Sequence, residues 1–351
     1  MTDGGGTGPE DRDDPEGWDD WSEDDVRVRP NPRGSRPRTK VRPSYEDAVP
    51  GFVTGVDRGR FRVLAADDAE VTATSARELG RGAVVVGDRV GLVGDTSGSA
   101  GALARIVRVE PRTTLLRRSA DDAPTGERDE RIIVANADRM LIVVAATDPE
   151  PRPRLVDRYL VAAVDVGIEP ILVVTKTDLA DPTAFISLFD GLGMQVVRST
   201  RADPPLARLR ELIDGHVAVA VGHSGVGKST LVNALVPEAE RATGDVNAVT
   251  GRGRHTSSSS IAYPVGSGWI VDTPGIRSFG LGHVSPDNVL DAFGDLAAIA
   301  DDPESGCPRG CTHLEDAPDC AIAEAVEEGR LGPGGAARLD SLRRLLTQIA
   351  R

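Results

Sequence analysis

Cysteine is scarce in this sequence, and long apolar runs are absent. The 351 residues include three cysteines, all between positions 307 and 320. An odd number in one short segment argues against the disulfide framework of a secreted protein. No apolar stretch approaches the roughly 20 residues that a bilayer-spanning helix needs, and the acidic, glycine-rich start lacks the basic and apolar regions of a signal peptide. We therefore expect a cytoplasmic protein that does not use a membrane, and we predict that it is a monomer.

Acidic residues exceed basic ones, but unevenly along the chain. The formal net charge is -14, and residues 1–25 hold eleven Asp or Glu against one Arg, which places -10 of that charge there. Residues 27–42 then hold seven Arg or Lys and no acid. A proline-rich polar segment buries too little apolar surface to fold alone, so we predict a disordered tail over residues 1–45. Its basic part is either solvated or an arm that meets RNA phosphates.

The rest of the chain, with 39% hydrophobic residues overall, is long enough for two or three domains. Residues 49–111 contain five short alternating stretches separated by glycine-rich breaks. This pattern predicts a small all-β barrel of the oligonucleotide-binding (OB) type, although an SH3-like barrel has a similar sequence pattern. The polar segment 112–131, marked by Gly and Pro, predicts a linker after the barrel.

Strands and helices alternate from about residue 130 to residue 285. Near-continuous Val/Ile runs at 138–146, 169–175 and 216–221 are typical of a parallel sheet covered on both faces. We therefore predict an α/β nucleotide-binding domain over 130–285. The remaining residues, 286–351, predict short helices, a Cys/His cluster and a closing helix.

A phosphate loop lies in the stretch "GHSGVGKST", residues 222–230, between a predicted strand and a predicted helix. Its glycines allow backbone N–H groups to turn toward phosphates, and the helix that follows directs its positive end at them. Lys228 is expected on the β- and γ-phosphates, with a catalytic role, and Ser229 on Mg²⁺. The nucleotide-binding residues predicted here are Gly222, His223, Ser224, Gly225, Val226, Gly227, Lys228, Ser229 and Thr230.

The stretch "WIVDTPG", residues 269–275, supplies the next part of a nucleotide site. Asp272 ends a predicted buried strand, where its carboxylate can hold the Mg²⁺ shell, and Gly275 can offer its N–H to a γ-phosphate. This pattern is weak alone, because turns at strand ends often contain Asp and Gly. After a phosphate loop at this distance, we interpret it as functional.

The stretch "TKTD", Thr175 to Asp178, predicts the reading of a guanine base. The Asp178 carboxylate can accept hydrogen bonds from two guanine N–H groups that adenine does not offer, and the Lys176 stem can lie over the ring. Thr175 stands where such motifs usually have Asn. Ser199 and Thr200, at the end of the next predicted strand, are candidates to meet the guanine oxygen.

The order of these motifs is unusual, because the base-reading stretch precedes the phosphate loop. A parallel sheet keeps its contacts when the old ends of the chain are joined and a new break is made elsewhere. The sequence therefore predicts a circularly permuted P-loop GTPase.

The three cysteines fall within fourteen residues of one another, with a histidine among them. Cys307, Cys311, His313 and Cys320 provide four ligands, enough for a closed tetrahedral Cys₃His site. We predict one structural zinc ion there, because a closed site leaves no open position for catalysis.

This chain resembles the ribosome small subunit-dependent GTPase A (RsgA/YjeQ) family from about Val49 to its end. The resemblance is carried by "GHSGVGKSTLVNAL", "GRGRHTSS", "DTPGIRSFGL" and "CPRGCTHLEDAPDCAI". It implies an OB barrel, a permuted GTPase domain and a helical zinc-binding domain, with Mg²⁺ accompanying GTP. It also implies a role in late maturation of the small (30S) ribosomal subunit, with contacts to 16S rRNA and GTP hydrolysis stimulated by that subunit.

The catalytic group is the least determined part of the site. Many GTPases have a Gln after the D-x-x-G sequence to orient water, and Ile276 stands there instead. The resemblance implies His255 as the substitute, since imidazole can hold a water or accept a proton; a loop histidine that contacts RNA is the alternative. Either Thr256 or Ser257 would supply the switch hydroxyl for Mg²⁺.

Three classes of function can be compared with these motifs. A ribosome-assembly GTPase fits all of them. An ATPase or kinase would need adenine recognition, against which Asp178 argues, and an RNA-binding module with a degenerate nucleotide fold would lack an intact Lys228 and Asp272. A regulatory GTPase or NTPase that binds RNA but does not act on the ribosome is the alternative function.

Overall fold

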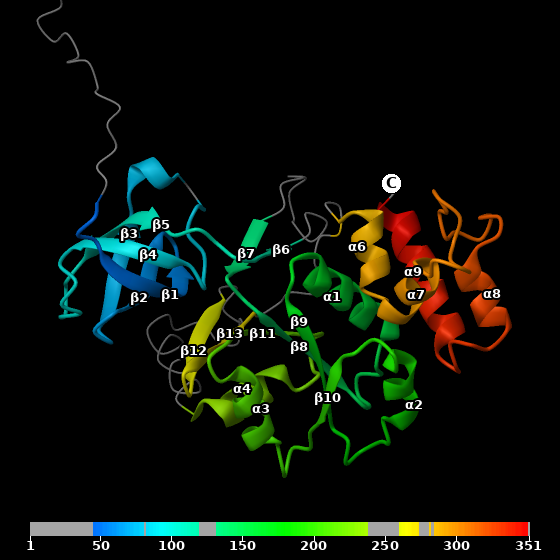
Figure 1. Cartoon of the computed structure of the whole chain (residues 1–351). Helices are drawn as coiled ribbons and strands as arrows, with labels where there is room; N and C mark the ends of the chain where they lie inside the picture. Colours follow the sequence, from blue (N-terminus) through cyan, green and yellow to red (C-terminus); the bar gives the residue numbers. More distant parts are fainter. Residues whose placement is uncertain are drawn as a thin grey trace, which may run out of the picture. The chain divides into compact units, whose positions relative to one another are not determined.

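The structure, a computed structural model (Figure 1), describes residues 45–80, 82–118, 131–237, 260–273, 281 and 284–349. The predicted tail over residues 1–45 lies outside these ranges except for Tyr45. Residues from Tyr45 onward belong to one compact unit. Within the described ranges, every helix is too short or too polar to traverse a bilayer.

The first part of this unit is a closed five-stranded barrel. The strands pair in the order β1-β2-β3-β5-β4, and pairing of β1 with β4 closes the ring. Only the β3–β5 pair is parallel. Alternate side chains point inward, so Val53, Val63 and Leu92 are almost fully buried. The predicted OB-type barrel is confirmed in this form. Its strands are β1 (Val49–Asp57), β2 (Arg60–Ala65), β3 (Glu70–Ser75), β4 (Arg89–Gly94) and β5 (Ala104–Val109).

The segment predicted as a linker contributes to a small second sheet. Strands β6 (Leu115–Arg118) and β7 (Arg131–Ala135) pair antiparallel. The apolar Leu116 in β6 is 2% exposed, and its burial explains why this end of a polar segment is ordered. Arg112 holds the segment to the barrel, since its guanidinium donates to both carboxylate oxygens of the fully buried Asp88 at 2.7 and 2.8 Å.

A six-stranded part of the main sheet forms the centre of the molecule. Its order is β10-β9-β8-β11-β13-β12, in which β12 alone is antiparallel to its neighbour. The chain therefore inserts its later strand β11 beside its earlier strand β8, as circular permutation predicts. The strands are β8 (Arg139–Ala145), β9 (Glu169–Thr175), β10 (Gln195–Arg198), β11 (Val217–Val221), β12 (Ile261–Val265) and β13 (Gly268–Asp272).

Helices cover both faces of this central sheet (Figure 1). In β8 successive residues alternate between two apolar cores: Met140 and Ile142 lie in one, Leu141 and Val143 in the other. The first core contains α1 (Pro153–Asp165), and the second contains α3 (Leu206–Ile213) and α4 (Lys228–Leu235). The short helix α2 (Thr183–Ile186) precedes β10. The near-continuous apolar strands of the sequence are thus buried on both sides, as predicted.

In the described part of the chain, four helices follow the sheet and share its first core. Leu339, Leu342 and Leu345 of α9 belong to the same apolar cluster as Val156 and Tyr159 of α1. These helices therefore pack on the nucleotide-binding part of the chain and do not have a separate core. They are α6 (Pro286–Asp291), α7 (Gly294–Ala300), α8 (Ala321–Glu327) and α9 (Gly335–Ile349).

The barrel is joined to the central sheet by strand pairing. The first residue of β12, Ile261, pairs with Gly55 of β1. Beside this pair, the rings of Phe52 in β1 and Trp269 in β13 lie 4.7 Å apart between centroids. All eleven strands of the barrel and the centre consequently belong to one continuous sheet.

Candidate functional site

The predicted phosphate loop connects the end of β11 to the start of α4. Gly222, Gly225 and Gly227 have φ values of 151°, 84° and 91°, which L side chains rarely adopt. A Cβ on Gly222 would lie 2.3 Å from the carbonyl oxygen of Val143. Glycine is therefore required there both by the dihedral angle and by the close approach of β8. Ser224, Gly225, Ser229 and Thr230 are exposed.

The lysine of this loop lies against the aspartate of the next predicted motif. Lys228 Nζ donates to Asp272 Oδ1 at 2.7 Å and to the Thr273 carbonyl oxygen at 3.2 Å. Thr273 is fixed in turn by a hydrogen bond from its hydroxyl to the Ala220 carbonyl oxygen at 2.7 Å. Parallel strands β11 and β13 are neighbours, so their carboxyl ends bring together residues that are 44 positions apart.

Thr175, in the predicted base-reading stretch, reaches the phosphate loop. This residue ends β9 and is 6% exposed, and its hydroxyl lies 2.5 Å from the Val226 carbonyl oxygen and 3.2 Å from that of Val144. A threonine hydroxyl is one donor, and the shorter distance assigns it to Val226. The side chain that replaces the usual Asn therefore ties the two nucleotide loops together.

Lys176 and Asp178 belong to the same turn after β9. Lys176 has a φ of 55°, and its ammonium group donates to the Asp148 carbonyl oxygen. Asp178 is exposed. Between them, the backbone N–H and the hydroxyl of Thr177 both lie 3.3 Å from the Ser199 carbonyl oxygen, which joins the turn to the end of β10.

Ser199 and Thr200 do not offer equivalent groups. The Ser199 N–H donates to the Val174 carbonyl oxygen at 2.8 Å, and this residue is 4% exposed. The Thr200 hydroxyl accepts a hydrogen bond from the Asp203 N–H at 2.9 Å. Because the Ser199 N–H extends the sheet, Thr200 is the better candidate of the two for a backbone contact to a guanine oxygen.

Several predicted site residues lie outside the described ranges. They belong to the segments before β12 and after β13 and are Gly275, His255, Thr256 and Ser257. Their roles remain predictions. Asp272, which the structure does describe, ends β13 directly before the second of these segments.

The predicted zinc ligands come together between α7 and α8. The ligand atoms of Cys307, Cys311, His313 and Cys320 all lie within 4.8 Å of one another. Cys307 Sγ is 3.6 Å from His313 Nδ1, and Cys320 Sγ is 3.9 Å from it. A tetrahedral ion with the usual Zn–S and Zn–N bonds would separate sulfur and nitrogen by about 3.6 Å, so this donor set fits zinc.

The surroundings of Cys307 also fit a metal-bound thiolate. Burial raises the pKa of the Cys307 thiol to about 11, against the opposing effect of hydrogen bonds from the backbone N–H groups of Ile322 and Ala321 at the start of α8. Burial also lowers the pKa of His313, which favours the neutral ring that a metal needs. The N–H groups stabilise negative charge on sulfur, as partners of metal ligands do.

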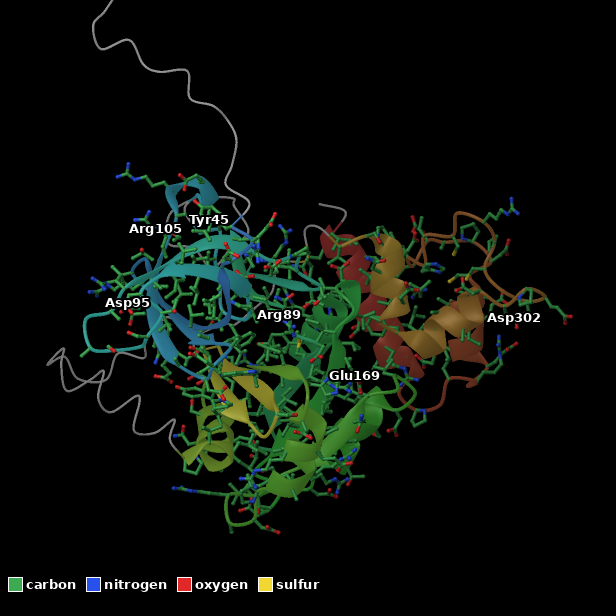
Figure 2. All side chains as sticks on the ribbon, turned by 60° about the vertical axis from the view of Figure 1, so that its left-hand side comes forward. Tyr45, Arg89, Asp95, Arg105, Glu169 and Asp302 are labelled. Atoms are coloured by element: carbon green, nitrogen blue, oxygen red, sulfur yellow. The ribbon has the colours of Figure 1, made fainter. Side chains whose placement is uncertain are left out.

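The histidine His216 lies at the other end of the sheet. Its Nδ1 is 2.9 Å from Asp138 Oδ2, and its Nε2 is 3.3 Å from Arg139 Nη2. Arg139 also pairs with Glu169, which starts β9 (Figure 2). These charged groups surround the amino ends of β8 and β9, whereas the nucleotide motifs follow carboxyl ends, so His216 has a structural role.

Comparisons with known proteins agree with this arrangement. Residues 109–282 match the sequence profile of the RsgA GTPase family. The small ribosomal subunit biogenesis GTPase RsgA of Pseudomonas putida is 38% identical over 277 residues, which are 76% of each chain. RsgA of Pseudomonas aeruginosa is 40% identical over 226 residues, 62% of this chain and 64% of that one. RsgA 1 of Vibrio vulnificus is 34% identical over 295 residues, 81% of this chain and 80% of that one.

Two solved structures share the fold. YloQ, described as a circularly permuted GTPase, superposes with a TM-score of 0.63 at 24% identity, over 88% of this chain and 96% of that one. YjeQ from Thermotoga maritima gives 0.62 at 23% identity, over 86% of this chain and 98% of that one. With these likenesses and the permuted order of its motifs, the chain is a GTPase and belongs to the RsgA GTPase family.

Proposed function

We propose that this protein is a GTPase of small ribosomal subunit assembly, which acts late in maturation of the 30S subunit and whose turnover that subunit stimulates. The names of its curated relatives support a role in small-subunit biogenesis. One observation carries the nucleotide part of the proposal. Thr175 links the base-reading turn to the same phosphate loop whose Lys228 lies on Asp272, which supports one common site for base, phosphate and metal.

The residues divide the work of hydrolysis among them. Lys228 stabilises the charge that develops on the transferred γ-phosphoryl group, and Asp178 with Lys176 selects guanine. Ser229, Asp272 and either Thr256 or Ser257 hold Mg²⁺, which neutralises charge on the phosphate oxygens when bound. His255 orients the attacking water, because Ile276 has no group for this task. GTP and water give GDP and phosphate.

A second metal has a structural role in this proposal. Cys307, Cys311, His313 and Cys320 hold one zinc ion that closes the loop between α7 and α8. The two partners proposed for the protein are the 30S subunit and its 16S rRNA, and the proposed location is the cytoplasm.

Phosphate release tests the proposal directly. We expect slow turnover by the protein alone and a large increase with purified 30S subunits, because switch segments without the usual Gln need a partner to order them. Purified 50S subunits serve as the control and should give no increase. Lys228→Ala should abolish turnover under both conditions, whereas Arg330→Ala, which removes an exposed charge paired with Glu328, should behave as wild type.

The outcomes separate the two halves of the proposal. GTP turnover that 30S subunits leave unchanged would support the alternative, a regulatory GTPase that binds RNA but does not act on the ribosome. Full activity of Lys228→Ala would contradict the site itself. His255→Ala should lower stimulated turnover far more than GTP affinity if it acts in the transition state, and equal losses would assign it to binding.

A further inference from the structure

A cavity of about 670 Å³ lies beside the phosphate loop, between the start of α1 and helix α9. This volume is within the range of small-molecule sites. His223, the second residue of the phosphate loop, forms part of its wall. Apart from His223, none of its lining residues belongs to the predicted GTP site. Its charged lining residues are Arg152, Arg154, Arg158, Arg344 and Asp340.

The cavity is positively charged although the whole chain carries a formal charge of -14. Its lining residues include four guanidinium groups and one carboxylate, Asp340, which pairs with Arg344 at 3.6 Å. Arg152 and Arg154 are exposed and border the first turn of α1, which no side chain caps. The positive end of a thirteen-residue helix adds to their potential. A negatively charged ligand is therefore favoured here.

Arg344 on the opposite wall is held in a defined position. Its Nη2 donates to the Ser341 hydroxyl at 2.8 Å and lies 3.6 Å from Asp157 Oδ2. Ser341 is itself buried and bonded to Asp157. The Nη1 of Arg344 lies 3.6 Å from Asp340 Oδ2, so Arg344 shares its charge with two carboxylates and fixes this wall of the cavity. The charge of a ligand would be met mainly by Arg152 and Arg154 across from it.

The rest of the lining is apolar and comes from three separate segments. Pro151 precedes α1, Leu155 lies in its first turn, Leu188 follows α2, and Ala337 belongs to α9. A ligand that fits this wall needs an apolar body beside its charge. We propose that the cavity binds a small phosphorylated ligand with an apolar body, at a site separate from that of GTP.

Such a ligand would influence the nucleotide site through His223. The ring nitrogen Nδ1 of this residue is 2.9 Å from the Ser224 carbonyl oxygen, within the phosphate loop. An occupant that contacts the ring therefore acts on the loop that holds the GTP phosphates. Any effect is reciprocal, so the nucleotide must change the affinity for the second ligand by the same factor.

Calorimetry with phenyl phosphate, which combines a phosphate with an apolar ring, tests the proposal. The protein is first saturated with Mg²⁺ and a non-hydrolysable GTP analogue, so that the phosphate positions of the GTP site are filled. We expect one phenyl phosphate per chain. Arg154→Ala should weaken its binding by about tenfold or more, because hydrogen bonds to charged groups are among the stronger ones.

Two controls make the result specific. Arg208→Ala removes an exposed helical arginine that is not among the lining residues and should leave the affinity unchanged. Inorganic phosphate should bind more weakly than phenyl phosphate, because it lacks the apolar body. No detectable binding of phenyl phosphate at about 10 mM, a concentration at which even weak specific sites are filled, would overturn the proposal. Equal losses in both arginine variants, or tighter binding of a short RNA than of phenyl phosphate, would overturn it as well.

Discussion

The buried carboxyl group of Asp157 should make the stability of this protein fall as the pH rises from 5 to 7. Asp157 lies in α1, is 4% exposed, and accepts a hydrogen bond from the Ser341 hydroxyl of α9. Burial raises its pKa to about 6, and neither the hydrogen bond from Ser341 nor the charge of Arg344 offsets that effect. Asp157 therefore links α1 to α9, and its carboxyl group loses its proton as the pH rises through about 6.

The size and sign of the effect follow from linkage. The folded protein holds this proton with a pKa of about 6 and the unfolded chain with one of about 3.9. The proton therefore stabilises the fold fully below the pKa of the unfolded chain, about 3.9. This stabilisation is lost as the pH rises through the pKa of the folded protein, about 6. Between pH 5 and pH 7 the loss is about 1.3 kcal/mol.

Urea unfolding of wild type and Asp157→Asn, with zinc present, isolates this contribution. The difference in unfolding free energy, wild type minus variant, should fall by about 1.3 kcal/mol between pH 5 and pH 7. Asp181→Asn is the control, because hydrogen bonds from Thr183 lower the pKa of that exposed group and it stays ionised over this range. A flat or rising difference for Asp157→Asn would refute the reasoning.

Substitutions at three further positions test the two candidate sites. Asp178→Asn should shift preference from GTP toward xanthosine triphosphate, whose 2-oxo group needs a donor, as measured by competition for binding; an unchanged preference would show that Asp178 does not read the base. Thr175→Val should weaken GTP and GDP binding by about tenfold, because it leaves the Val226 carbonyl oxygen without its partner, while Thr175→Ser should bind nearly as wild type. Cys311→Ser should lose the single zinc found by elemental analysis and loosen the C-terminal helices with little change in GTP binding; a wild-type protein that is folded without metal would contradict this.

The motifs could be predicted from the sequence because each depends on neighbours in the chain. Gly222 and Gly227 are needed for the shape of one loop, and Cys307 and His313 are six residues apart, so spacing alone limited their geometry. The barrel and the parallel sheet followed from periods of two and from continuous apolar runs. A feature can be predicted in this way when all of its residues lie in one short segment of the sequence.

Features that join distant segments could not be predicted in this way. Ser341 and Asp157 are 184 positions apart, and no local pattern marks a serine as the partner of a buried acid. The pairing of Thr175 with Val226 depends on how β9 and the phosphate loop meet across the sheet. That β6 forms an ordered strand depends on the burial of Leu116. The residues around Leu116 are as polar as those of a linker, so the sequence did not indicate a strand there.

The permutation places the barrel and the C-terminal helices next to segments that GTPases use as switches. The two parts are attached to the GTPase domain in different ways. The C-terminal helices share an apolar core with α1, and Asn288 of α6 bonds to Asp165 of α1 at 2.7 Å. Because close-packed cores resist sliding, these helices should move with α1 as one body.

The barrel meets the central sheet at a strand that is itself next to a switch. Ile261 pairs with Gly55 and follows the segment of Thr256 and Ser257 by only a few residues. A change in that segment on hydrolysis would act on β12, and β12 is the strand of the central sheet that pairs with β1 of the barrel. Ladder pairs at the end of a strand are lost more readily than a shared core. We therefore expect the nucleotide state to be expressed mainly as the position of the barrel, through β12, while the zinc-binding helices stay fixed on α1.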